Sequence, residues 1–179
     1  MKQQILFVHG AGSGAHALDG KLAASLQQAL GANYQVKNPQ MPSEGAPQYT
    51  LWKDEIARQL KTFDDTPILV GHSLGASVLL KYLSEEVVEI PIRGLFMIAA
   101  PYWGEDMNEY KLSENFAAHL PKGLPIFLYQ SRNDEEVPFT HLAMYAEKLP
   151  LATVREFDGR GHQFNDDLSE VAADILHMT

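Results

Sequence analysis

The chain contains no cysteine among its 179 residues. This absence excludes disulfide bonds, thiolate-bound metals and a cysteine nucleophile, and it fits a reducing compartment. Basic residues are also few, since 14 Lys and Arg stand against 23 Asp and Glu and the net charge is -9. Because an acidic surface repels phosphate groups and anionic headgroups, we expect neither nucleic acid nor a membrane surface as a partner.

Long hydrophobic runs are missing as well. The apolar stretch at residues 5–8 is far too short for a signal peptide or a membrane span. The sequence also has no internal repeat, low-complexity tract or linker, and its length suits one domain. We therefore expect a single cytoplasmic domain over residues 1–179, present as a monomer or a weak dimer.

Short apolar runs alternate with longer amphipathic stretches along the chain. Strands are predicted at residues 5–8, 34–37, 67–70, 93–100, 125–129 and 153–157. Helices are predicted at residues 16–30, 50–60, 74–83, 139–149 and 166–177, and the first of them carries Leu18, Leu22, Leu26 and Leu30 at helical spacing. Apolar strands joined by helices predict the α/β class: a three-layer α/β/α sandwich with about six mainly parallel strands and helices on both faces.

One irregular stretch of some size remains, at residues 102–123 between the fourth and fifth predicted strands. It is polar and aromatic, and a short helix is expected around residues 114–120. Its Tyr102, Trp103, Met107 and Phe116 allow two interpretations. They form either a small apolar wall beside a binding site or ordinary packing beneath a loop.

The sequence GHSLG at residues 71–75 matches the pattern G-x-S-x-G between a predicted strand and a predicted helix. In such a tight turn the serine backbone is strained, and a bulky residue two positions to either side would clash. The turn lifts the Ser73 hydroxyl above the sheet and near a helix N-terminus, where free N–H groups favour a developing negative charge. The pattern predicts a nucleophilic Ser73, and the alternative is a Gly/Ser turn without chemistry.

A nucleophilic serine needs a base, and the base needs an acid that orients it. Asp134 follows the strand predicted at 125–129, and His162 follows the strand at 153–157 on a glycine-rich loop. Because the carboxyl ends of parallel strands meet at one sheet edge, we predict that Ser73, Asp134 and His162 converge there. The alternatives that we rank below them are the acids Glu135, Glu136 and Asp158 and the histidines His16, His119, His141 and His177.

An oxyanion hole needs two backbone N–H donors. We expect them from Leu74, the residue after the nucleophile, and from Ala11 in the glycine-rich loop at residues 9–14. That loop lacks the lysine of a phosphate-binding loop and matches the dinucleotide motif only weakly. The chemistry requires no metal or cofactor, and no cluster with metal-ligand spacing is present in the sequence. The candidates for substrate contacts are Gly10, His72, Tyr102 and Trp103.

The segments FVHGAGSG, GHSLGAS, SRNDEEVP and GRGHQF together resemble the α/β-hydrolase superfamily across nearly the whole chain. With this length and strand number, the chain is most similar to the small serine hydrolases of the retinoblastoma-binding-protein-9 and YdeN type. The resemblance implies a minimal α/β-hydrolase sheet, without the first two strands of larger members and with a short cap-like insertion at 102–123. It also implies a triad of Ser73, Asp134 and His162 and an oxyanion loop at residues 9–11.

These observations predict a carboxylesterase-like serine hydrolase that cleaves small carboxylic esters through an acyl-enzyme, with thioesters and amides as further substrates to test. The short insertion favours small or short-acyl esters over triglycerides. Activity should fall at low pH, once His162 becomes protonated. The alternatives are a non-catalytic protein-binding module on the same fold and an enzyme of other chemistry, such as a lyase or a cofactor-free peroxidase.

Overall fold

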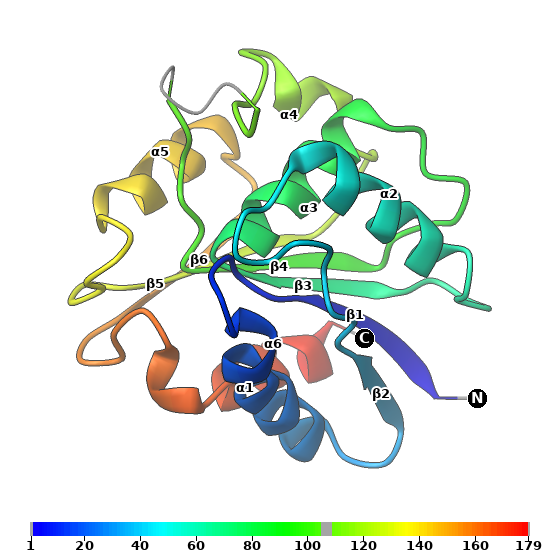
Figure 1. Ribbon diagram of the computed structural model, residues 1–179, viewed down its shortest axis with the longest axis horizontal. Helices are drawn as coiled ribbons and strands as arrows, with labels where there is room; N and C mark the ends of the chain where they lie inside the picture. Colours follow the sequence, from blue (N-terminus) through cyan, green and yellow to red (C-terminus); the bar gives the residue numbers. More distant parts are fainter. Residues whose placement is uncertain (1, 105–108, 179) are drawn as a thin grey trace.

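The computed structural model describes residues 2–104 and 109–178 (Figure 1). Its strands pair in parallel in one sheet of order β2-β1-β3-β4-β5-β6. Every predicted strand is present, with ends that shift by at most two residues. The strands are β1 (Gln3–Val8), β2 (Tyr34–Lys37), β3 (Ile68–His72), β4 (Gly94–Ile98), β5 (Ile126–Ser131) and β6 (Thr153–Phe157).

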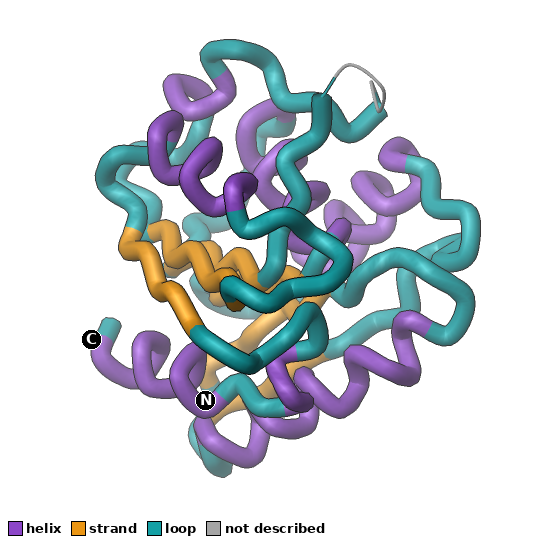
Figure 2. Tube along the Cα trace, turned by 90° about the vertical axis from the view of Figure 1, so that its left-hand side faces the viewer, coloured by secondary structure: helices purple, strands orange, loops and turns teal. Residues whose placement is uncertain are grey.

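Helices lie on both sides of this sheet, as the two perpendicular views show (Figure 1, Figure 2). One face carries α1 (Ala15–Leu30) and α6 (Ser169–His177). The other carries α2 (Tyr49–Leu60), α3 (Leu74–Glu85), α4 (Phe116–His119) and α5 (Thr140–Lys148). The predicted three-layer α/β/α sandwich is therefore confirmed. The last helix begins three residues later than expected, because a separate 3-10 turn at Phe164–Asp166 precedes it.

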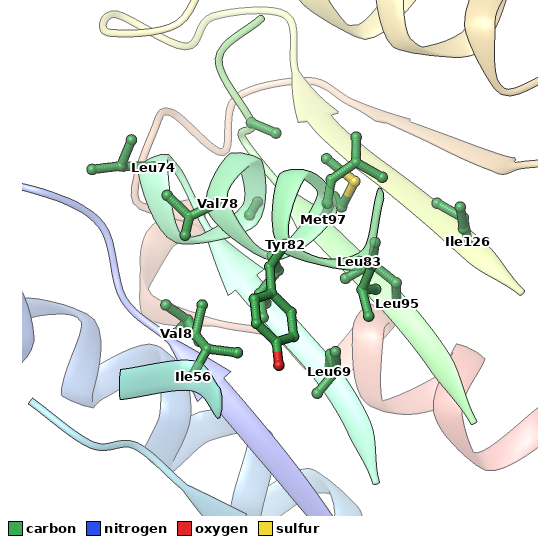
Figure 3. Packing of buried hydrophobic residues seen from close by; sticks show 14 of the residues in the cluster. Val8, Ile56, Leu69, Leu74, Val78, Tyr82, Leu83, Leu95, Met97 and Ile126 are labelled. Carbon is green, nitrogen blue, oxygen red and sulfur yellow. The ribbon is translucent and has the colours of Figure 1, made fainter. Parts of the chain in front are cut away.

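Two hydrophobic cores fill the spaces between the layers. Alternate residues of β1 face opposite sides, so that Ile5 and Phe7 join one core while Leu6 and Val8 join the other. All residues of β3 and β4 are buried, which explains why both strands occur as continuous apolar runs in the sequence. Figure 3 shows α3 lying on the sheet. One buried cluster includes Leu74, Val78, Tyr82 and Leu83 of the helix and Val8, Leu69, Leu95 and Met97 of the strands.

The buried face of α1 differs from the stripe of leucines in the sequence. Leu22 and Leu26 are fully buried, but Leu18 is 47% exposed and Asp19 is only 2% exposed. Asp19 precedes Leu22 by three residues and Leu26 by seven, so it lies on the same helix face as both, whereas Leu18 lies about 100° away from Asp19 around the helix. Asp19 lies inside because its carboxylate accepts the backbone N–H of Gly10 and bonds His72.

The stretch between β4 and β5 packs largely against the core. Phe116 on α4 is fully buried and Tyr110 is 5% exposed, so both belong to the hydrophobic core. Met107 lies outside the described residues. Within residues 2–104 and 109–178, no helix has both the length and the apolar character that a membrane crossing requires.

Candidate active site

Ser73 lies between β3 and α3 with φ 52° and ψ -123°, a conformation that a residue with a side chain rarely adopts. The flanking glycines make this turn feasible. A Cβ on Gly71 would lie 2.5 Å from the Cα of Ala76, and a Cβ on Gly75 would lie 2.2 Å from the carbonyl oxygen of Val8. Strand and helix thus meet without room for side chains at these two positions, and the strained serine is held at the carboxyl end of β3. We call this turn, residues 71–75, the elbow.

His162 and Asp134 are hydrogen-bonded. Nδ1 of His162 lies 2.9 Å and 3.0 Å from the two carboxylate oxygens of Asp134, whose side chain is completely buried. Backbone N–H groups of Glu136 and Val137 donate to Oδ1, and the amide of Gln130 donates to Oδ2. Burial alone would raise the pKa of Asp134, but the hydrogen bonds from His162, Val137 and Glu136 lower it. The ionised carboxylate therefore holds the proton on Nδ1 and leaves the Nε2 lone pair free.

The loop after β5 also fixes the loop after β6, a contact that the sequence analysis missed. Consecutive N–H groups of residues 160–162 donate to three alternate side chains, Ser131, Asn133 and Glu135, over 3.0 Å, 3.1 Å and 3.1 Å. The signal in the sequence was the polar run SRNDEE directly after a strand. These three hydrogen bonds fix the position of the backbone segment that carries His162.

The alternative acids and histidines make other contacts. Glu135 bonds the backbone N–H of His162, whereas the side chain of Asp158 is 88% exposed and pairs with Arg132. His141 lines the same cleft as Ser73, but its Nδ1 accepts the N–H of Tyr102, and burial lowers the pKa of His141. Among the described residues, Asp134 is the acid that contacts the His162 ring.

The two expected oxyanion donors are unpaired. Within the described part of the chain, neither the N–H of Ala11 nor that of Leu74 donates a hydrogen bond. His9, two residues before Ala11, accepts the N–H of Met41 at Nε2. Its ring proton is therefore on Nδ1, and it donates to the carbonyl of Gly10 over 2.7 Å. Burial lowers the pKa of His9, in agreement with a neutral ring. Because the C=O and the next N–H of a trans peptide point in opposite directions, this bond fixes the direction of the Ala11 N–H.

A second histidine–carboxylate pair lies beneath the elbow. His72 is 2% exposed, its Nδ1 is 2.7 Å from Oδ2 of Asp19, and its Nε2 is 3.0 Å from the carbonyl oxygen of His162. Asp19 also accepts the N–H of Gly10 and the amide of Gln163. Burial would raise the pKa of Asp19, but the hydrogen bonds and the charge of His72 bring it down to about 2. The sequence analysis identified neither Asp19 nor Gln163.

A cleft of about 610 Å³ brings most of the predicted residues together. Ser73, His162, Gly10, Ala11, His72 and Trp103 line it. Tyr102 does not: it packs edge-on against Tyr145 at 4.9 Å between ring centroids. Asp134 lies behind His162, and Trp103 contributes an indole N–H that is buried without a hydrogen-bond partner among the described residues. Across residues 2–104 and 109–178, no cluster of three or more His, Asp and Glu side chains suits a metal ion.

Residues 6–167 match the family described as serine hydrolase. By structure, the chain is similar to the YdeN protein of B. subtilis, with 19% identity, coverage of 99% of this chain and 98% of that chain, and a TM-score of 0.74. It is also similar to a monoacylglycerol lipase of Paleococcus ferrophilus, with 18% identity, coverage of 97% and 92%, and a TM-score of 0.69. The esterase domain of a Rhodothermus marinus protein gives 18% identity, coverage of 97% and 82%, and a TM-score of 0.67.

No curated protein sequence matches the chain significantly. The identities to the solved structures are low, so these structures establish the fold, whereas the family match extends over most of the chain and includes Ser73, Asp134 and His162. Family and fold together support hydrolase activity. The chain belongs to the serine hydrolase family and has an α/β-hydrolase fold of the YdeN type.

Proposed function

We propose that this protein hydrolyses small carboxylic esters through an acyl-enzyme formed on Ser73. The observation that carries the proposal is a convergence on one cleft. Ser73 on its strained elbow, the hydrogen-bonded pair of His162 and Asp134, and the unpaired N–H of Ala11 come from four separate loops to the carboxyl edge of the sheet. Structural packing alone gives no reason for this combination.

In the proposed reaction, the Nε2 lone pair of His162 takes the hydroxyl proton as Oγ of Ser73 attacks the ester carbonyl. The N–H groups of Ala11 and Leu74 hold the resulting oxyanion, and Asp134 stabilises the imidazolium. His162 then gives its proton to the departing alcohol, and water repeats the sequence on the acyl-enzyme. Among the described residues the Ser73 hydroxyl has no hydrogen-bond partner, and bonds of this kind often tighten only when substrate binds.

The charges around the cleft favour a neutral ester. Among the described residues, its lining includes Glu135 and Glu136 but neither lysine nor arginine. Glu136 is exposed at the rim, so the local potential disfavours substrates that carry a carboxylate or a phosphate. The volume is typical of pockets for small molecules, and Trp103, Val137 and Pro138 supply apolar surface. Neutral short-acyl esters therefore fit the cleft best.

The test is intact-mass labelling with a fluorophosphonate, a reagent that captures serines activated by a base. We expect a single adduct on the wild type, none on Ser73→Ala and strongly slowed labelling on His162→Ala. Ser13→Ala is the matched control, because Ser13 is an exposed serine in the glycine-rich loop and should leave labelling unchanged. Hydrolysis of p-nitrophenyl esters of graded acyl length would then define the substrate range. If the folded wild type gave no adduct from neutral to mildly alkaline pH, the enzyme proposal would fail in favour of a binding module.

A further inference from the structure

Asp19 and His72 form a buried pair beneath the nucleophile, and the reaction proposed above does not use either side chain. The carbonyl of His162 can only accept a hydrogen bond, so Nε2 of His72 carries a proton. The carboxylate of Asp19 likewise accepts from Nδ1. His72 is therefore an imidazolium, and its counter-ion Asp19 lies 2.7 Å away at 3% side-chain exposure.

This ion pair contacts two loops that the chemistry requires. Oδ2 of Asp19 accepts the N–H of Gly10 over 2.7 Å, and Oδ1 accepts the amide of Gln163 over 2.8 Å. Gly10 precedes the expected oxyanion donor, and Gln163 follows the expected base. The backbone of Gly10 packs closely against Ser73, since a Cβ on Gly10 would lie 3.2 Å from the Cβ of Ser73.

We propose that Asp19 and His72 are positioning residues, whose ion pair holds the oxyanion loop and the base loop at the correct separation for attack by Ser73. The inference rests on the proposed ester hydrolysis. The pair acts only while His72 carries both ring protons. A neutral imidazole has one N–H, so it can bond either Asp19 or the carbonyl of His162, and the other contact becomes a repulsion between lone pairs.

The groups that face His72 keep it charged. Burial by itself lowers the pKa of His72, but the hydrogen bond and charge of Asp19 on α1 raise it, as do the carbonyl of His162 and the charge of Asp134. The net result is a raised pKa. The ring of His162 is the other titratable group in contact, at 4.8 Å between ring centroids. Removing the charge of Asp19 therefore removes the main reason for His72 to remain protonated.

The variant Asp19→Asn tests this mechanism with almost no change of shape. Its carbonyl oxygen can still accept from Gly10 and His72, and its amide can face Gln163 once that side chain turns its own oxygen inward. What disappears is the negative charge. We expect kcat for p-nitrophenyl acetate to fall roughly 10- to 100-fold near pH 8 with little change in KM, because the loops lose register.

The decisive quantity is the ratio of kcat of Asp19→Asn to that of the wild type across pH. The titration of His162 is common to both proteins and largely cancels in this ratio. We expect the ratio to rise several-fold as pH falls from roughly 7 to 5, because burial lowers the pKa of His72 once the charge of Asp19 is gone, and acid then restores the charge of the ring. A packing defect would give a constant ratio. Asp54→Asn, an exposed acid on α2, is the matched control and should keep the ratio near one.

A ratio that stays constant, or kcat within twofold of the wild type throughout, would overturn the inference. Nitrogen NMR of histidine-labelled wild type gives an independent reading even if Asp19→Asn does not fold. The His72 ring should show two protonated nitrogens at neutral pH, and a neutral tautomer would equally overturn the inference. If the wild type showed neither ester hydrolysis nor fluorophosphonate labelling, the proposed function would be rejected instead. The NMR measurement of the His72 protonation state would remain valid in that case.

Discussion

The substitution Asp134→Asn separates the charge of the acid from its shape. In the wild type, Oδ1 accepts the N–H groups of Glu136 and Val137 over 2.9 Å and 2.8 Å, so an asparagine must place its oxygen there. Its NH₂ group then occupies the Oδ2 position, 2.9 Å from Nδ1 of His162. Because the amide donates, it favours the tautomer with the proton on Nε2, which cannot accept the proton of Ser73.

We expect kcat to fall by about 10³- to 10⁴-fold, or roughly 4–5.5 kcal/mol of transition-state stabilisation, as for a triad with the wrong tautomer. The assay measures p-nitrophenyl acetate hydrolysis, with the rate of Ser73→Ala subtracted as background. The rate of fluorophosphonate labelling is measured on the same variants. Asp158→Asn is the control, since that acid lies on the same loop as His162 and its side chain is 88% exposed. If Asp134→Asn kept kcat within tenfold of the wild type while folded, the tautomer argument would be refuted.

Three further outcomes can be measured. Gly75→Ala should lower the free energy of unfolding in urea by about 3 kcal/mol or more, because its methyl group would lie 2.2 Å from the carbonyl oxygen of Val8. Gly104→Ala, whose methyl group would have no described atom within 4 Å, should change the free energy by less than about 0.5 kcal/mol. Glu136→Lys should raise kcat/KM for an anionic half-ester about 3- to 10-fold relative to a neutral ester, and added salt should remove the gain. The pKa of Asp134 is lower in the folded state than in the unfolded state, so its stabilisation is fully present above the unfolded-state pKa and is lost as pH falls through the folded-state pKa. Urea unfolding should therefore show the wild type's advantage over Asp134→Asn shrinking as pH falls below about 5, and a constant advantage would contradict the assignment.

The sequence predicted the sheet well because burial leaves a strong local signal. Strands β3 and β4 are buried on both faces and stand out as apolar runs closed by small residues. The helix ends were less predictable. The helix predicted to begin at residue 166 begins at Ser169 instead, because three residues of positive φ, Phe164–Asp166, precede it, and a backbone of this kind has no clear signature in residues other than glycine.

The residues of the candidate site likewise include some that the sequence predicts and some that it does not. The elbow could be predicted because the backbone itself requires the glycines at 71 and 75. Asp19 could not, because its partner His72 is 53 residues away and nothing local marks an acid inside an apolar stripe as functional. Tyr102 was a reasonable choice from composition, yet its ring turns toward Tyr145, and only the packing of α5 decides that.

The active site draws on both helix layers of the sandwich, and this dependence has a consequence for stability. Ser73 precedes α3 on one face of the sheet, whereas Asp19 comes from α1 on the other. The position of Asp19 is set by the packing of Leu22 and Leu26 against the sheet and α6. Any loosening of α1 therefore releases the N–H of Gly10 and the charge of His72 before the strands separate, so that catalysis should fail at lower denaturant than the sheet does.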